Sequence, residues 1–330
     1  MSNDARNTMT DFSAVGLAVG HATDARGGTG CTVLRGVDGA LRGAACVFGR
    51  ATGTRELDAL SPTHQAGRVD AVLLTGGSAY GLDAAAGVMR WMEERRRGFD
   101  VGVGVVPIVP AAVIFDLAPL GDFRARPTAD MAYAACESAR LTDIAEGSVG
   151  VGTGATVGKG AGRETAMKGG FGCAVRSAGD AFVCAAAVVN SLGDVRSADG
   201  RIIAGARDTD GAFLDSAKLL AKYGSSRFAA AAVTPQHTTL CVVATNLSLE
   251  RGELAQLARA AGAALFRRIT PVGTSFDGDV VFALCQPDGA RGALMPLEIT
   301  AVAALEEAIE RGVRRAIGSD GVPGLADETK

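Results

Sequence analysis

The chain has 330 residues, 48% of them hydrophobic and 21% charged, with a formal net charge of −3 at pH 7. This composition fits a globular protein with a large core, and 33 basic residues mixed with 36 acidic ones provide no basic face for nucleic acid. No apolar run approaches the roughly 18 residues that a membrane helix needs, and residues 1–6 lack the features of an export signal, so we expect a cytoplasmic protein that binds neither nucleic acid nor membrane.

The cysteines and histidines argue against a metal site. The seven cysteines are widely spaced and form no C-x-x-C pair. The three histidines, His21, His64 and His237, form no H-E-x-x-H motif and no Cys/His cluster. We therefore expect neither a metal nor a cofactor.

The first half of the chain contains a glycine-rich strand, turn and helix. The 45 glycines gather beside small and β-branched residues, which indicates tight turns and close backbone approach. Residues 71–75 predict a buried strand and Gly76–Gly77 its turn. Residues 82–95 predict a helix, with apolar residues at helical spacing at Leu82, Ala86, Met89 and Met92.

Two strands are predicted in the middle of the chain. The stretch 184–195 predicts a strand that runs into a polar turn at Asn190. Residues 240–245 are apolar or β-branched without alternation, which predicts a strand buried on both faces. Thr238 and Thr239 open this second strand directly after a loop, so a hydroxyl stands where the strand leaves a turn.

The C-terminal part predicts a helix over residues 254–265, a strand over 278–286 and a helix over 302–313 that ends before Gly318. Strands and helices alternate without a linker that would mark a domain boundary. We therefore expect one domain that spans residues 1–330.

Familiar nucleotide-binding and hydrolase motifs do not fit this sequence. In GTGATVGKG, Thr153 stands where a P-loop needs its first glycine, and Gly160 follows Lys159 in place of Ser or Thr. GVGTG at 150–154 lacks the third glycine of the dinucleotide fingerprint at its proper offset. No G-x-S-x-G elbow surrounds Ser78, and nothing in the sequence supports a Ser-His-Asp triad.

A threonine at the start of a strand has another chemical use. If the chain were cut before Thr238, the freed α-amine, with a reference pKa of about 7.7–8.0, could act as the base for the adjacent hydroxyl. This arrangement needs no histidine. It competes with the ordinary interpretation, in which two threonines at a strand start are simply good β-formers.

Six motifs in series carry a resemblance that covers nearly the whole chain. The sequence resembles the L-aminopeptidase/D-esterase family, which includes β-peptidyl aminopeptidases and nylon-oligomer hydrolases. The motifs are TGGSAYGLDAAAGV, VPIVPAAVIFDL, GVGTGATVGK, VVNSLGDV, TTLCVVATN and DGDVVFAL. The resemblance implies an α+β fold, a four-layer αββα sandwich of the N-terminal-nucleophile type, and self-cleavage into residues 1–237 and 238–330.

The resemblance also implies roles for single residues. Thr238 would be the nucleophile, Asn190 would donate to the oxyanion, and Asp277 and Asp279 would orient the nucleophile. Lys159 would lie near the nucleophile, as in the nylon-hydrolase branch. Each has a structural alternative: Asn190 as a turn residue, D-G-D as a hairpin turn, and Lys159 as a solvated charge.

The sequence departs from the family pattern in two places. His237 stands at the cleavage site, where processed members often have Asn or Gly. The stretch that includes Val113 and Phe115, expected to bind substrate, is apolar where the aminopeptidase branch has an acid for the substrate's ammonium group. Recognition of a free amino terminus would then need a carboxylate elsewhere, such as Asp116 or one from a neighbouring subunit.

The expected activity is therefore hydrolysis of a small amide or short peptide through an acyl-enzyme on Thr238, in a homo-oligomer of four or more subunits. One alternative is a threonine-dependent acyltransferase resembling ornithine acetyltransferase, which passes the acyl group to an amine. Another is an unprocessed, non-catalytic family member. Product analysis with an amine acceptor, and the mass of the chain, distinguish the three.

Overall fold

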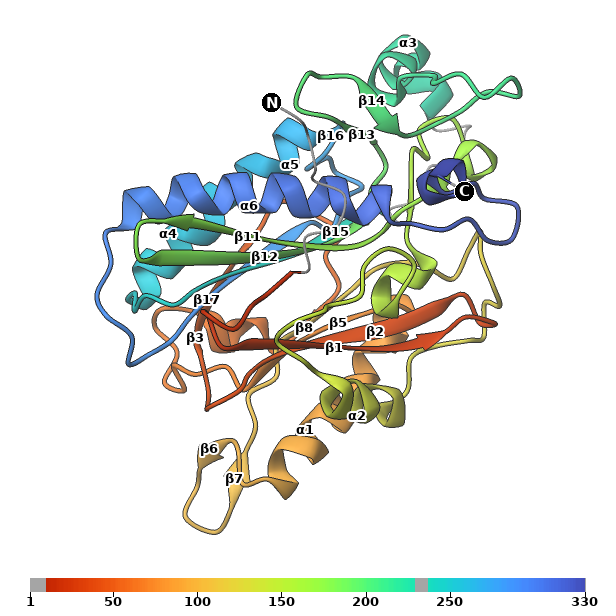
Figure 1. The fold of residues 1–330 in the computed structure, drawn as a ribbon. Helices are drawn as coiled ribbons and strands as arrows, with labels where there is room; N and C mark the ends of the chain where they lie inside the picture. The colour runs from red at the N-terminus through yellow and green to blue at the C-terminus, as the bar shows by residue number, and fades with distance from the viewer. Residues whose placement is uncertain (1–9, 229–236, 330) are drawn as a thin grey trace.

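The computed structural model describes the backbone of residues 10–228 and 237–329. Within these ranges the helices and strands form four layers in the order helix–sheet–sheet–helix (Figure 1). The first sheet has the strand order β1-β2-β5-β8-β4. Its strands are β1 (Leu17–Asp24), β2 (Thr29–Gly36), β5 (Ala71–Thr75), β8 (Ala111–Val113) and β4 (Thr54–Arg55). This arrangement confirms the predicted αββα sandwich.

The second sheet contains the strand that opens at Thr238. Its order is β11-β12-β15-β17-β3, with β15 parallel to β17 and the other neighbours antiparallel. Every residue of β15 is buried because the strand is central, which explains its unbroken apolar sequence. The strands are β11 (Gly170–Ala178), β12 (Ala181–Asn190), β15 (Thr238–Thr245), β17 (Val280–Cys285) and β3 (Arg42–Val47).

Helices cover the outer face of each sheet. The helices α1 (Ala85–Glu94) and α2 (Ala129–Ser138) pack on the first sheet. The second sheet is covered by α4 (Arg251–Ala261), α5 (Ala263–Arg268) and α6 (Leu294–Arg314). A further cluster of buried apolar side chains, which includes Phe171 and Phe282, fills the space between the two sheets.

All three predicted helices differ in their bounds, and the one predicted over 302–313 begins earlier, at Leu294. The helix predicted over 82–95 begins at Ala85, because the preceding turn is a 3-10 segment, η2 (Ser78–Ala84), that packs Gly81 tightly on the carbonyl of Gly76. The helix predicted over 254–265 is interrupted at Gly262, where a Cβ would collide with the ring of Phe48.

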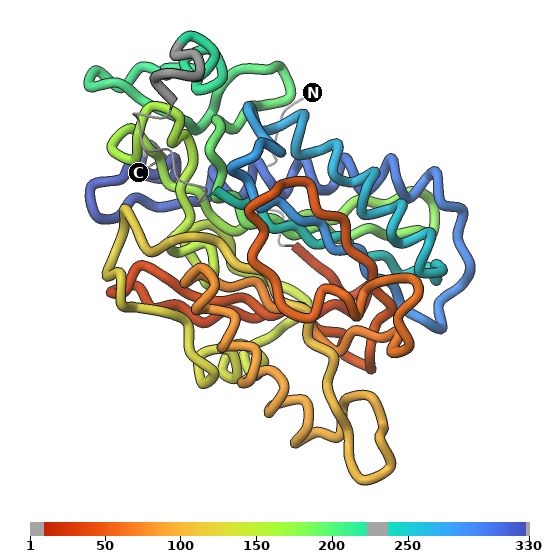
Figure 2. Tube along the Cα trace, turned by 180° about the vertical axis from the view of Figure 1, so that it is seen from behind, coloured from red at the N-terminus to blue at the C-terminus, as the bar shows by residue number. Residues whose placement is uncertain are grey.

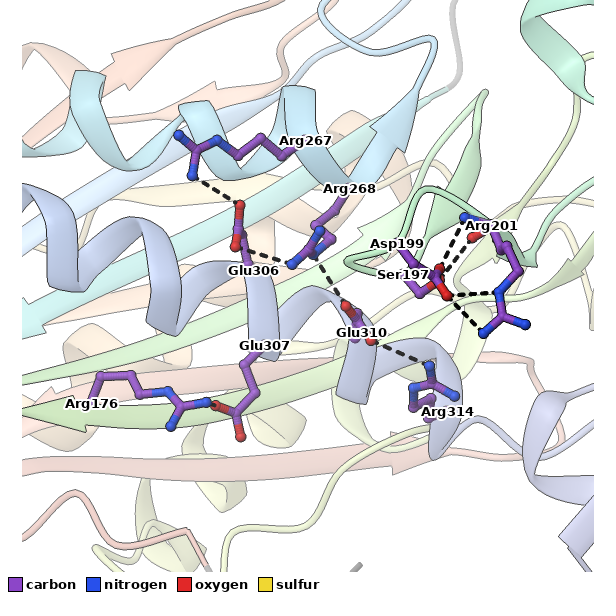
Figure 3. A network of polar contacts seen from close by, with 10 residues as sticks. All are labelled: Arg176, Ser197, Asp199, Arg201, Arg267, Arg268, Glu306, Glu307, Glu310 and Arg314. Carbon is purple, nitrogen blue, oxygen red and sulfur yellow. Dashed lines mark hydrogen bonds and ion pairs between the residues drawn. The ribbon is translucent and has the colours of Figure 1, made fainter. Parts of the chain in front are cut away.

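Ion pairs attach α6 to the elements beside it, as Figure 3 shows. Arg268 of α5 contacts Glu306 at 3.1 Å and Glu310 at 3.2 Å, so one partly buried guanidinium joins two successive turns of α6. Arg176 of β11 contacts Glu307 at 2.6 Å on the neighbouring face of the helix. The contacts fix α6 along the sheet that carries β15.

The remaining elements lie at the ends of the sandwich. A small sheet of β13 (Asp194–Arg196), β14 (Ile202–Ala204) and β16 (Ile269–Thr270) lies near α3 (Ser216–Phe228). The hairpin of β6 (Phe99–Asp100) and β7 (Val105–Val106) projects from the opposite end, as the view from behind shows (Figure 2). Short elements complete the chain: β9 (Thr156–Val157), β10 (Met167–Lys168), η1 (Leu57–Leu60), η3 (Gly150–Gly154), η4 (Arg163–Thr165) and η5 (Leu325–Thr329).

None of the helices in the described ranges combines the length and the apolar character required to cross a membrane.

Candidate active site

Thr238 is the first residue of β15 and lies directly across the strand pair from Asn190, the last residue of β12. Thr238 is 5% exposed and Asn190 is fully buried. The Thr238 hydroxyl donates a hydrogen bond of 2.7 Å to the carbonyl oxygen of His237, the residue before it. The hydroxyl is therefore held beside the peptide bond that self-cleavage would break.

A backbone N–H also contacts that carbonyl. Gly278 lies between Asp277 and Asp279, and its N–H donates to the His237 carbonyl oxygen at 2.7 Å. His237 pairs with Asp277 in a parallel β-bridge, which fixes this geometry. A carbonyl that accepts from an N–H in a buried site is polarised toward attack at its carbon, because the same donor stabilises the developing negative charge.

Hydrogen bonds fix the orientation of the Asn190 amide. Its Oδ1 accepts from the backbone N–H of Thr156 at 3.1 Å and from Lys159 Nζ at 2.9 Å. Its Nδ2 donates to the carbonyl oxygen of Phe115 at 3.3 Å. Since the backbone N–H of Thr156 can only donate and the carbonyl of Phe115 can only accept, the amide cannot be flipped. Nδ2 carries a second hydrogen that can serve an incoming oxygen.

Lys159 is buried behind Asn190, contrary to the structural alternative of a solvated charge. Its Nζ also donates to the carbonyl oxygen of Thr156 at 2.9 Å. Burial lowers the pKa of Lys159 to about 7, a shift that Asp277 opposes and Arg163 reinforces. The lysine therefore changes its charge near neutral pH.

The two aspartates hold different backbone segments. Asp279 accepts from the N–H of Thr239 at 2.6 Å and from the N–H of Gly273 at 3.2 Å, so it ties the start of β15 to the loop before β17. Asp277 accepts from the N–H of Thr274 at 2.8 Å. Burial raises both pKa values, and the charge of Asp277 helps to bring that of Asp279 to about 7.

His237, the other residue of the expected cleavage site, is 6% exposed. Burial, together with the charges of Lys159 and Arg163, lowers its pKa to about 2. The imidazole is therefore neutral at physiological pH.

The two residues expected to bind substrate occupy different positions. Phe115 touches Asn190 through its carbonyl, its ring is half-buried, and the guanidinium of Arg163 lies 5.7 Å from the ring centre. Val113 is buried in β8, where its side chain lies beside Gly53. The structure brings Phe115 to the site, while the role of Val113 stays a prediction.

A pocket of about 290 Å³ is lined by residues from the segments that follow Asn190 and precede Asp277. Leu192, two positions after Asn190, forms part of its wall, and Phe276, just before Asp277, forms another part. The volume suits a small ligand, since such pockets begin at about 300 Å³. Its lining is mostly apolar and comprises Leu192, Ala217, Leu220, Pro271, Thr274, Ser275 and Phe276.

Sequence reasoning missed three groups at this site. Thr156 contacts both Asn190 and Lys159, and its position three residues before Lys159 in a glycine-rich turn was an available signal. Arg163 adds a positive charge beside Phe115. The N–H of Gly278 acts through the backbone, which residue types do not reveal. Within the described ranges, no group of three or more His, Cys, Asp or Glu side chains is arranged to hold a metal ion.

The chain has relatives among known proteins over most of its length. The chain is 41% identical to an uncharacterised aminopeptidase of Mycobacterium tuberculosis, over 97% of each chain. It is 30% identical to a 6-aminohexanoate-oligomer endohydrolase of Kocuria, over 83% of this chain and 74% of that protein.

The fold has a solved counterpart. The L-aminopeptidase D-Ala-esterase/amidase of Ochrobactrum anthropi, described as a variant of the N-terminal-nucleophile hydrolase fold, superposes with a TM-score of 0.65 at 19% identity, over 94% of this chain and 88% of that one. The sequence model of peptidase family S58 matches residues 7–325. The chain therefore belongs to peptidase family S58 and is a hydrolase that acts on amide or peptide bonds.

Proposed function

We propose that the chain cuts itself between His237 and Thr238 and then hydrolyses amides with the new amino-terminal threonine. The observation that carries this proposal is the 2.7 Å hydrogen bond from the Thr238 hydroxyl to the His237 carbonyl oxygen. The N–H of Gly278 on the same oxygen supports it, because that donor can stabilise the charge of the tetrahedral intermediate.

The cleavage step balances without any further reagent than water. Thr238 Oγ1 attacks the carbonyl carbon of His237, the C–N bond breaks, and the hydroxyl proton passes to the departing nitrogen. Water then hydrolyses the ester, which leaves a carboxyl group on His237 and a free α-amine on Thr238. Two chains, residues 1–237 and 238–330, remain in one fold because β15 lies in the middle of the second sheet.

The processed enzyme would use the same hydroxyl on a substrate. The α-amine of Thr238 takes the hydroxyl proton, Oγ1 attacks the amide carbon, and the same proton passes to the leaving amine. The second N–H of Asn190 donates to the oxyanion, and water releases the acyl group from Thr238. A charged Lys159 would favour the unprotonated form of the amine, and Asp279 would keep the start of β15 in position.

The substrate proposed here is an uncharged amide or a short peptide with an apolar segment. The apolar pocket between Leu192 and Phe276 would take that segment. The relative named as a 6-aminohexanoate-oligomer endohydrolase supports an activity within a chain of amides, whereas the relative named as an aminopeptidase supports one at a free amino terminus, and the apolar pocket favours the first.

Matched variants test the proposal. Thr238→Val removes the hydroxyl and keeps the shape, so the chain should stay intact by mass and hydrolyse no amide. Thr245→Val is the control, because it makes the same change at the far end of β15, away from Asp279 and the proposed cleavage site. An active, uncut Thr238→Val protein would refute the proposal.

Product analysis distinguishes the hydrolase from an acyltransferase. With an added amine acceptor, a hydrolase releases mostly free acid, whereas an acyltransferase forms mostly the new amide.

Assembly into a homo-oligomer also belongs to this proposal. Met295 and Ile299 on α6 are 70% and 67% exposed, and light scattering of the processed protein measures whether such apolar surface is shared between subunits.

A further inference from the structure

A second buried pair of ionisable residues lies near the active site and has no part in the reaction proposed above. Asp116 is 2% exposed and Lys168 is fully buried. Burial raises the pKa of Asp116 to about 6 and lowers that of Lys168 to about 8, while each charge favours the charged form of the other. Burying two such groups costs free energy that an apolar pair would not.

The contacts of Asp116 lead to one side of the Asn190 amide. Its two carboxyl oxygens accept from the hydroxyl of Thr29 at 2.6 Å and from the N–H of Gly77 at 2.6 Å. Asp116 directly follows Phe115, whose carbonyl oxygen accepts from Asn190 Nδ2. The carboxyl thus attaches the Phe115 segment to β2 and to the turn after β5.

The contacts of Lys168 lead to the other side of the same amide. Lys168 pairs with Thr156 in the register of β10 and β9, and the N–H of Thr156 donates to Asn190 Oδ1. The ammonium of Lys168 donates to the carbonyl of Thr153, at the end of η3. Gly154, the next residue, has no room for a Cβ because the Asp116 side chain lies against it.

We infer that Asp116 and Lys168 are positioning residues that fix the two anchors of the Asn190 amide, Phe115 and Thr156, and so aim its second N–H at the oxyanion. Neither residue touches the substrate. The inference rests on the proposed role of Asn190 in the reaction. It also means that Asp116 cannot be the carboxylate that receives a substrate ammonium, since both of its oxygens are occupied and buried.

A double-mutant cycle on turnover tests the inference. Asp116→Asn removes the negative charge that faces Lys168, and its amide can keep both contacts only if the Thr29 hydroxyl turns from donor to acceptor. It should lower kcat about tenfold in the processed protein with KM within twofold. Asn190→Ala should lower kcat about a hundredfold. The kcat of the double variant should equal that of Asn190→Ala within about twofold, because Asp116 acts only by positioning the Asn190 amide.

Asp70→Asn is the matched control. Asp70 is fully buried and accepts from the N–H of Ile108 and from Arg68, at the opposite end of β5 from Gly77. Asp70→Asn should change kcat by less than twofold, both in the otherwise wild-type protein and in the Asn190→Ala variant. If Asp116→Asn does not fold, Thr29 provides the same test: Thr29→Val removes the donor and should lower kcat, whereas Thr29→Ser keeps it and should restore activity.

The possible failures are distinguishable. If Asn190→Ala costs activity but the losses multiply in the double variant, the positioning role is wrong and the proposed reaction stands. The same holds if folded Asp116→Asn and Thr29→Val turn over at the wild-type rate. If Asn190→Ala alone turns over normally, the role of Asn190 is wrong and this inference fails with it.

Discussion

Replacing Gly278 by alanine should disable both self-cleavage and amide hydrolysis, although it adds only one methyl group. A Cβ at this position would lie 2.7 Å from Thr238 Oγ1 and 2.7 Å from the carbonyl oxygen of Ala51. Gly278 does not have the positive φ that favours glycine, so the backbone itself tolerates alanine. The effect is therefore steric and falls on the proposed nucleophile.

The magnitude follows from those two distances. Each is 0.7 Å shorter than the 3.4 Å at which ordinary van der Waals contact begins, and the neighbour on one side is backbone. The Thr238 hydroxyl, or the Gly278 N–H that binds the His237 carbonyl, must move by a comparable amount. Since a misplacement of about 1 Å can cost about a hundredfold in rate, we expect a loss of that size, equivalent to about 2.7 kcal/mol of barrier.

Intact mass over time measures self-cleavage, and release of amine from a p-nitroanilide measures turnover of the processed chains. Gly252→Ala is the control, because a Cβ there meets nothing within 4 Å and lies in α4, where alanine favours the helix. A Gly278→Ala protein that cleaves and turns over within threefold of wild type would refute the steric argument, because the added methyl group would then displace neither Thr238 Oγ1 nor the Gly278 N–H from its working position.

Three further predictions follow from the same site. Asn190→Ala should lower kcat about a hundredfold with little change in KM, whereas Asn246→Ala, at the other end of β15, should not. An amide with a free amino terminus should react no more than tenfold faster than its N-acetyl counterpart, and a hundredfold preference in kcat/KM would contradict this. The folded pKa of Lys159, about 7, lies below its unfolded value, so the folded state binds fewer protons and gains stability as the pH rises from 7 to 9. Lys159→Met should lose this gain, about 2 kcal/mol in urea unfolding.

The sequence predicted the elements whose boundaries are chemically sharp. The strand over 71–75 has the predicted bounds because a fully apolar run meets a Gly-Gly turn, and the strand that ends at Asn190 stops where the predicted turn begins. The strands β9 and β10 have two residues each, too few for any periodicity to show. Close packing at a single glycine, such as Gly262 against the ring of Phe48, also has no recognisable pattern in the sequence.

The candidate site also has features that the sequence predicted and features that it did not. A resemblance supplied Thr238, Asn190 and Lys159, but their geometry depends on strand register between distant segments, which sequence patterns do not give. Burial of Lys159 and Asp116 is unusual for their residue types, since such residues are usually exposed unless paired. Half of their hydrogen bonds are made to backbone groups, and these have no signature in the sequence.

The pH dependence of this site belongs to the coupled set of groups and cannot be assigned to one residue. Lys159 and Asp279 both have pKa values of about 7, and each interacts with Asp277. The α-amine proposed at Thr238 would titrate near 7.7–8.0 in the same range. A bell-shaped rate profile would therefore report macroscopic values of the set. The contributions are separated by measuring how far each limb of the pH–rate profile moves in Lys159→Met and in Asp279→Asn. Loss of the lysine charge removes an attraction that favours the ionised form of Asp277. Loss of the Asp279 charge removes a repulsion that opposes the same ionised form.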